Sequence, residues 1–206
     1  MTFPNDKYAG PGDYFSAYAA ELSRAASAID TAAFDGAADL LRAAIAGRKT
    51  IFSCGNGGSC AISNHLLCDF AKGIQTDTEF LPSVISLSAS TELITAIAND
   101  IHYDEIFAYQ LRTLARPGDV LITISSSGDS ENIVRAIDWA RTHELHTVAF
   151  TGFRGGRSSK LADVNVHVPS DNYGVIEDLH QSTMHVLAQA LRMEGMSNEK
   201  IAAVKF

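Results

Sequence analysis

The stretch KTIFSCGNGGSCAISNH spans residues 49–65 and changes character along its length. Its first six residues form a short run that is typical of a buried strand. Three glycines follow within GNGGS (55–59), and a helical pattern that reaches His65 comes after them. Glycines side by side cost conformational entropy. Their place between a strand and a helix therefore indicates a turn whose backbone approaches a ligand.

The rest of the chain repeats this alternation of strand and helix. We expect further strands at 81–87, 119–125, 145–151 and 164–169, and helices at 59–73, 91–98, 103–115, 130–143 and 174–194. Residues 13–48 have the spacing of two helices, and Asp30 or Thr31 could cap the second. Alternation of this kind implies parallel strands joined by helical crossovers. We predict one α/β domain over residues 1–206, with a doubly wound, five-stranded parallel sheet of flavodoxin-like type and an N-terminal helical extension.

Composition excludes several classes of protein. The 206 residues carry a formal net charge of -8, which argues against a nucleic-acid partner. The chain has no apolar run long enough for a transmembrane helix, and its N-terminus lacks the features of a secretory signal. Its three cysteines are odd in number and form no C-x-x-C motif. We therefore expect reduced thiols and a cytoplasmic protein without membrane partners.

A second turn follows the strand at 119–125 and reads SSSGDS, residues 125–130. Four hydroxyls and a glycine at the start of a helix can supply O–H and N–H donors to one phosphate without a cation. Helix capping alone could explain Ser130, but it does not require Ser125 and Ser127 as well. We therefore predict a phosphate site here, suited to a phosphosugar.

A set of possible metal ligands lies on two of the expected helices. His65 and Asp69 are four residues apart and so share one helix face. Glu177 and His185 are eight apart, about 80° around the last helix, and can still converge on one ion. His180 competes with His185 for this role, and a histidine on an apolar helix can also be an ordinary core residue. Two histidines and two carboxylates suit Zn²⁺ and are tolerable for other divalent ions.

Four segments of the chain resemble the sugar isomerase (SIS) domain, and within it the phosphoheptose isomerases. These are GNGGS with its helix, ISSSGDSENIVRAI (124–137), SLSASTELITAIANDIHYDEIFAYQL (86–111) and IEDLHQSTMHVL (176–187). The likeness covers nearly the whole chain and implies a cytoplasmic homotetramer whose active sites are shared between subunits. Residues 1–48 would then be the helical oligomerisation segment.

The resemblance also implies roles for individual residues. Phosphate would be bound by Ser125, Ser127 and Ser130 with the Ser126 backbone, and the sugar by Asn56, Gly57, Ser59, Asn99 and Asp100. The family's zinc ligands are His, Glu, Gln and His, and the matching residues here are His65, Asp69, Glu177 and His185. Asp69 is one methylene shorter than the family's residue, and Glu177 carries a charge where the family has an amide.

The implied reaction interconverts a ketose and an aldose phosphate through a cis-enediolate. Asp69 would act as the base and His185 as the acid, while the metal stabilises developing negative charge. The expected substrate is sedoheptulose 7-phosphate, in the synthesis of lipopolysaccharide heptose. Two alternatives remain open: a non-catalytic SIS module that binds a phosphosugar or a protein such as a replication initiator, and an isomerase of another phosphosugar.

Overall fold

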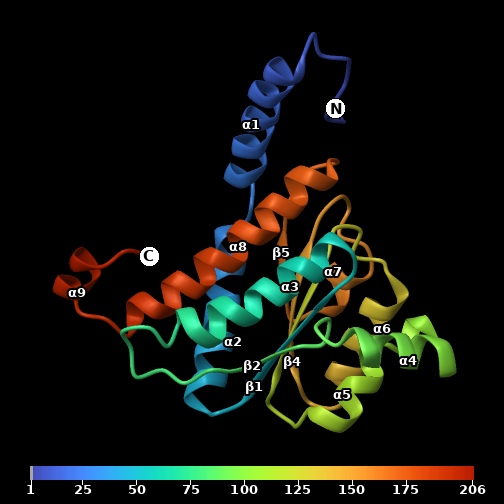
Figure 1. Cartoon of the computed structure of the whole chain (residues 1–206), viewed down its shortest axis with the longest axis vertical. Helices are drawn as coiled ribbons and strands as arrows, with labels where there is room; N and C mark the ends of the chain where they lie inside the picture. The colour runs from blue at the N-terminus through green and yellow to red at the C-terminus, as the bar shows by residue number, and fades with distance from the viewer. Residues whose placement is uncertain (1) are drawn as a thin grey trace.

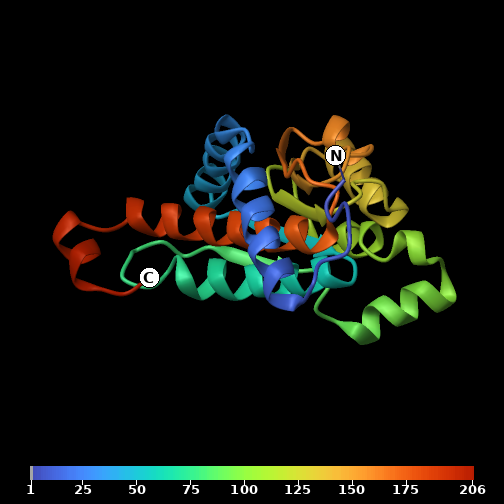
Figure 2. The same cartoon turned by 90° about the horizontal axis from the view of Figure 1, so that it is seen from above.

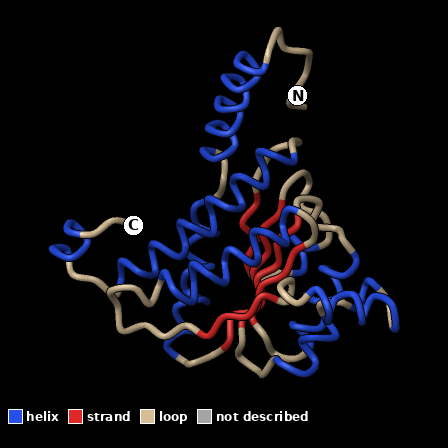
Figure 3. The backbone as a smooth tube through the Cα atoms, in the orientation of Figure 1, coloured by secondary structure: helices blue, strands red, loops and turns tan. Residues whose placement is uncertain are grey.

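Five parallel strands form the centre of the protein, between two layers of helices (Figures 1 and 3). The computed structural model describes residues 2–206, so Met1 of the expected oligomerisation segment lies outside it. The strands are β1 (Thr50–Gly55), β2 (Ser83–Ser86), β3 (Val120–Ser125), β4 (His146–Thr151) and β5 (Val164–His167). Their order is β2-β1-β3-β4-β5, with every neighbouring pair parallel. This is the flavodoxin-like order, and its switch point lies between β1 and β3.

The helices alternate with these strands along the chain. They are α1 (Pro11–Ser27), α2 (Thr31–Ala46), α3 (Gly58–Cys68), α4 (Thr91–Asp100), α5 (Ala108–Leu114), α6 (Glu131–Thr142), α7 (Ser158–Leu161), α8 (Tyr173–Glu194) and α9 (Asn198–Ala203). Of the two candidates for the cap of α2, Asp30 is the one that caps it, because its side chain accepts a hydrogen bond from the Ala32 amide. The fold class and the order of elements are thus confirmed.

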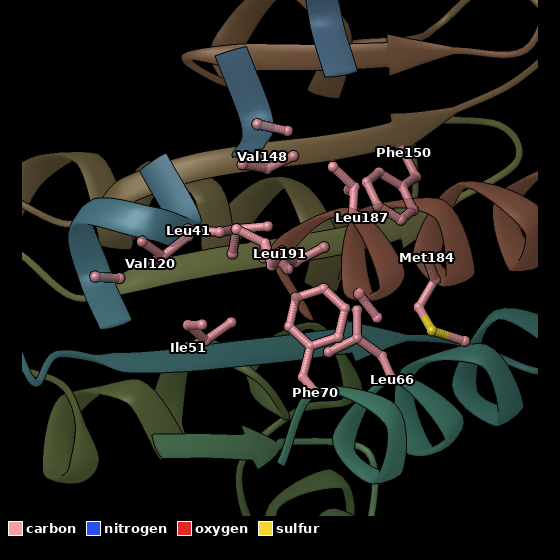
Figure 4. Packing of buried hydrophobic residues seen from close by; sticks show 14 of the residues in the cluster. Leu41, Ile51, Leu66, Phe70, Val120, Val148, Phe150, Met184, Leu187 and Leu191 are labelled. Carbon is pink, nitrogen blue, oxygen red and sulfur yellow. The ribbon is translucent and has the colours of Figure 1, made fainter. Parts of the chain in front are cut away.

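Each face of the sheet buries its own apolar layer. Val120, Ile122 and Ile124 of β3 join a cluster formed with α2, α3 and α8, part of which is seen in Figure 4. The intervening Leu121 joins a second cluster, formed with α4, α5 and α6. Because strand side chains alternate between faces, a run of apolar residues marks a strand that is covered on both sides.

Three details differ from the prediction. The helix expected at 59–73 is an α-helix only to Cys68 and continues as a π-helical turn, η1 (Asp69–Gly73). The helix expected at 103–115 is divided into a 3₁₀ turn, η2 (Tyr103–Glu105), and α5. The short helices α7 and α9 were not predicted.

Helix α1 projects away from the sheet, as Figure 1 shows, and in the view from above it crosses over α8 (Figure 2). Ala25 is its one fully buried residue, and it packs near Val175 and Ile176 of α8. Between α1, the N-terminal arm and the loop before α8 lies an open groove of about 810 Å³. Of the helices within residues 2–206, none combines the length and the apolar character that crossing a bilayer requires.

Candidate active site

The two glycine- and serine-containing turns meet at one edge of the sheet. They follow β1 and β3, which are neighbours in the sheet, so their carboxyl ends lie side by side. A pocket of about 160 Å³ opens between them. It is lined by Asn56, Ser59, Ile124, Ser125, Ser126, Ser127, Ser130, Tyr173 and Glu177. Six of the predicted substrate-binding residues are therefore gathered around one cavity at the switch point, where ligands of open parallel sheets bind.

The turn after β3, residues 125–130, is called the serine turn below. Its hydroxyl groups are arranged as hydrogen-bond donors. Ser125 Oγ accepts a hydrogen bond from the Gly128 amide and Ser127 Oγ from the Asp129 amide, each at 3.2 Å. A hydroxyl that accepts from the main chain keeps its own proton available for a ligand. Ser130 is the N-cap residue of α6, yet its side chain makes no capping hydrogen bond. Capping therefore does not account for Ser130.

The first turn brings a helix start to the same pocket. Gly57 has φ +56°, in the region that favours glycine, and it precedes the first residue of α3. A Cβ on Gly58 would stand 2.5 Å from one carboxylate oxygen of Glu177 and 2.7 Å from the other. The Glu177 carboxylate thus lies against the positive end of α3, which stabilises negative charge. Glycine at position 58 leaves the room for it.

A pair of asparagines holds one wall of the pocket. Asn56 and Asn132 exchange side-chain amide hydrogen bonds of 2.9 and 3.0 Å, and the Tyr103 hydroxyl donates to Asn56 Oδ1 at 3.1 Å. Sequence reasoning singled out Asn56 but missed Asn132 and Tyr103, as well as Tyr173. No spacing in the sequence signals these three, because the contacts join residues on different elements.

A histidine–aspartate cluster lies between α3, η1 and α8. His185 Nδ1 is 2.8 Å from Asp69 Oδ2, and His65 Nε2 is 3.3 Å from Asp69 Oδ1. The amide nitrogen of Gln181 lies 2.9 Å from His65 Nδ1 and 3.0 Å from His185 Nε2. The prediction omitted Gln181, although its place four residues from both Glu177 and His185 puts it on the same helix stripe.

These side chains fit a divalent ion. One donor atom from each of His65, Asp69 and His185 can be chosen so that all three lie within 4.8 Å of one another. Ligands bound tetrahedrally to zinc at 2.0–2.1 Å stand roughly 3.4 Å apart, so modest side-chain shifts would complete the set. The cluster does not include Glu177, whose carboxylate is directed at Gly58 instead. Its ligand role therefore remains a prediction.

The remaining predicted residues lie elsewhere. His180 is fully buried beside Phe150, apart from the cluster, and burial lowers its pKa to about 4. Asn99 and Asp100 are exposed at the end of α4, where the Asn99 amide donates to the Asp100 carboxylate at 2.7 Å. Neither lines the serine pocket, so within one chain the structure does not bring them to the other predicted sugar contacts.

The fold and the pocket together define a class of protein. At the switch point between β1 and β3, a flavodoxin-like sheet carries a pocket lined by serine hydroxyls and by no lysine or arginine. The His–Asp cluster lies further along α8. That combination is suited to holding a sugar phosphate while a proton is moved at its other end.

Comparisons with known proteins agree with this class. The SIS domain family model matches residues 13–152. Phosphoheptose isomerase of Bordetella avium is 40% identical over 159 residues, which cover 76% of this chain and 80% of the relative. A probable phosphoheptose isomerase of Thermoplasma acidophilum is 36% identical over 170 residues, or 82% of this chain and 93% of the relative.

Solved structures show the same likeness. Phosphoheptose isomerase GmhA from Neisseria gonorrhoeae superposes with a TM-score of 0.82 at 30% identity, covering 89% of this chain and all of that one. A phosphoheptose isomerase from Francisella tularensis gives 0.81 at 30% identity, over 88% of this chain and 96% of that one. The chain belongs to the SIS-domain family, and it groups there with the sugar phosphate isomerases. The family resemblance seen in the sequence is confirmed.

Proposed function

We propose that this enzyme interconverts sedoheptulose 7-phosphate and D-glycero-D-manno-heptose 7-phosphate through a cis-enediolate. The relatives named phosphoheptose isomerase support this choice of substrate. The observation that carries it is the position of two groups on α8: Glu177 faces the serine pocket, and His185 lies in the His–Asp cluster. One helix thus connects a place for the phosphate with a place for proton transfer.

The spacing of these groups suits a long sugar phosphate. Eight residues of α-helix separate Glu177 from His185, a rise of about 12 Å. From C1 to the phosphorus of an extended heptose 7-phosphate there are eight bonds, or about 10 Å at the advance per bond of an extended chain. A pentose 5-phosphate reaches only about 7 Å by the same reasoning. The rise along α8 is therefore closer to the length of a heptose 7-phosphate than to that of a pentose 5-phosphate, which supports a seven-carbon substrate.

Proton transfer is assigned to Asp69 and His185. Starting from the ketose, Asp69 removes a proton from C1, which gives the cis-enediolate, and His185 donates a proton to its C2 oxygen, which gives the enediol. His185 then takes the proton of the C1 hydroxyl, and Asp69 returns a proton to C2 to form the aldose. The 2.8 Å contact between the two side chains supports this assignment, because protons that move at adjacent atoms of the substrate require an acid and a base close to each other.

The cluster would hold one divalent ion, most simply zinc, through His65, Asp69 and His185. When bound, that ion supplies a positive charge that polarises the carbonyl oxygen. Gln181 orients both imidazoles, and Glu177 accepts hydrogen bonds from sugar hydroxyls in the pocket. A set with one carboxylate leaves zinc a net positive charge, whereas Glu177 as a further ligand would neutralise it.

Isomerisation in D₂O tests the function. The enzyme, supplied with Zn²⁺, is incubated with ketose phosphates of five, six and seven carbons and followed by NMR. We expect the heptose to turn over fastest, with deuterium at C2 of the aldose, and Asp69→Asn to abolish exchange. A chain that binds phosphosugars but exchanges no proton with any of them would instead be a non-catalytic SIS module. Preference for a pentose phosphate would contradict the assigned substrate.

We further propose that the enzyme is a cytoplasmic homotetramer. The three cysteines are all free, which is typical of a reducing compartment. The largely uncovered helix α1, in which only Ala25 is buried, supports oligomerisation. In such an assembly Asn99 and Asp100, which lie away from their own chain's pocket, would approach the site of a neighbour.

A further inference from the structure

A loop formed by residues 152–158 packs directly on the serine turn. The Gly152 amide donates to the Ser126 carbonyl at 3.0 Å, and the Ser158 amide donates to the Gly128 carbonyl at 2.9 Å. A Cβ on Gly128 would overlap the Gly155 carbonyl oxygen. Two carbonyl groups of the turn are thereby held toward this loop. The loop therefore sets the orientation of the turn's peptide groups.

Among residues 152–158, all of which the structure describes, Arg157 is the one whose side chain forms hydrogen bonds with the turn and the start of α6. Its Nη2 donates to the main-chain carbonyl of Asp129 at 2.8 Å, and its Nε to the Asp129 carboxylate at 2.6 Å. Its Nη1 donates to the Glu131 carboxylate at 2.8 Å. Asp129 and Glu131 flank Ser130, one of the hydroxyls that line the pocket. A single guanidinium thus spans the residues on both sides of Ser130.

The contact of Arg157 with Asp129 would affect phosphate binding because the pocket itself supplies no positive side chain. None of the nine lining residues is a lysine or arginine, and one of them, Glu177, is acidic. Glu131 has a second partner in Arg135, at 2.9 Å, but among residues 2–206 Asp129 forms an ion pair with Arg157 alone. Without Arg157, the carboxylate of Asp129 would stand uncompensated one residue from Ser130, and it would repel a dianionic phosphate held in the pocket.

We propose that Arg157 is a positioning residue that sets the enzyme's affinity for the phosphate group, by neutralising Asp129 and fixing its carbonyl beside Ser130. This inference rests on the proposed binding of phosphate at the serine turn. Arg157 does not line the pocket, so it acts through the turn and not on the sugar.

The test compares Arg157→Met with Arg154→Met, a control in the same loop whose arginine makes no hydrogen bond or ion pair within residues 2–206. Two quantities are measured: KM for sedoheptulose 7-phosphate and the competitive inhibition constant of inorganic phosphate. We expect Arg157→Met to raise both about tenfold, as suits loss of a charge-assisted contact, with kcat within about twofold. Arg154→Met should match the parent enzyme.

A second substitution distinguishes the effect of the Asp129 charge from a structural effect of losing Arg157. Adding Asp129→Asn to Arg157→Met removes the repelling carboxylate and should recover most of the lost phosphate affinity. If the double variant binds phosphate as weakly as Arg157→Met, the proposed neutralisation is wrong. If Arg157→Met does not fold, Asp129→Asn by itself tests the inference. The guanidinium then faces the Glu131 carboxylate alone, so the net charge beside Ser130 rises by one and phosphate should bind about threefold more tightly. An unchanged or weaker affinity in that variant overturns the inference.

The double variant Ser125→Ala/Ser127→Ala distinguishes a failure of this inference from a failure of the proposed phosphate binding at the serine turn. Should that variant lose phosphate affinity while Arg157→Met keeps it, only the role of Arg157 falls. Should the serine variant bind phosphate like the parent enzyme, the phosphate site itself is misplaced, and both proposals fall together.

Discussion

The side chains of Ser125 and Ser127 each do two things: they shape the turn and they can bind a ligand. Each hydroxyl oxygen accepts a main-chain hydrogen bond that shapes the turn, and each hydroxyl retains a proton that can rotate toward a ligand or toward the neighbouring hydroxyl. Their oxygens lie 3.5 Å apart, close enough to address the same phosphate group. A turn built in this way recognises an anion through dipoles, so the protein does not need a lysine or arginine in the pocket.

Replacing both serines by alanine should weaken sugar phosphate binding by a few kcal/mol, because each lost hydrogen bond to a charged group is worth about 1.5–3 kcal/mol. Isothermal titration with the sugar phosphate measures the loss, and circular dichroism shows whether the variant is folded. A folded double variant with unchanged affinity would refute the phosphate site.

His180 is a titratable group held in an apolar interior. Its side chain is fully buried on α8 beside Phe150 and the Thr151 main chain, and neither ring nitrogen has a hydrogen-bond partner of good geometry among residues 2–206. Burial disfavours the charged imidazolium and lowers the pKa to about 4 in the folded protein. The unfolded chain, with a pKa near 6.5, takes up the proton first.

This difference predicts a loss of stability in mild acid. Between pH 6.5 and 4 the unfolded state binds more protons than the folded state, so the free energy of unfolding falls as the pH falls. From pH 7.5 to 5.0 the contribution of His180 is about 2 kcal/mol. Urea unfolding of His180→Leu should show a correspondingly weaker dependence on pH. An equally steep acid loss in this variant would assign the effect to other groups, such as the half-buried His167.

On the scale of elements, α8 organises the whole candidate site. Glu177, Gln181 and His185 follow one another at intervals of four residues, so they form a stripe along one side of the helix. The stripe begins at the serine pocket and ends at the His–Asp cluster. The π-helical turn that begins at Asp69 changes the helical register where the carboxylate meets His185. Turns of this kind are frequent at functional sites.

Metal content should follow this stripe. Protein purified without chelators should contain close to one zinc per chain by elemental analysis. His65→Ala and His185→Ala should lose most of it, because each removes one of three strong donors. Glu177→Ala should keep the metal, since the Glu177 carboxylate is directed at Gly58. Loss of zinc from Glu177→Ala would instead support the four-ligand set that the family resemblance implies.

The limits of sequence reasoning are also clearest at this scale. Alternating apolar strands and periodic helices revealed the parallel sheet, and the turns after β1 and β3 revealed the pocket. The helix α7 has four residues and α9 has six, too few for a hydrophobic period to show. Likewise, a π-turn inside a helical pattern leaves no signal of its own. Asn132 escaped notice because its partner Asn56 lies 76 residues away in sequence.

On the scale of the whole molecule, α1 is the feature that a single chain does not explain. Only Ala25 of its 17 residues is buried, while Phe15 is 71% exposed. Its last turns are anchored to the body, for example by the Arg24 side chain, which donates to the Pro169 carbonyl at 2.9 Å. The first turns extend beyond it, while Phe3 of the segment before α1 stacks on Tyr14 and packs against the buried cluster beneath α8. An apolar helix held out in this way is suited to a bundle with other copies of the chain.

We predict that four copies of the chain form a homotetramer. Four chains of 22.1 kDa give a mass of about 88 kDa, which light scattering at micromolar concentration can measure. Phe15→Glu should shift that mass toward the monomer, since burying a phenylalanine is worth about 2–3 kcal/mol and a buried carboxylate is costly. Ser16→Glu adds the same charge beside it without removing apolar surface, and it should dissociate less. If active sites are shared, the Phe15→Glu monomer keeps its secondary structure and loses its activity. A mass near 22 kDa for the parent protein, with full activity, contradicts both the assembly and the shared site.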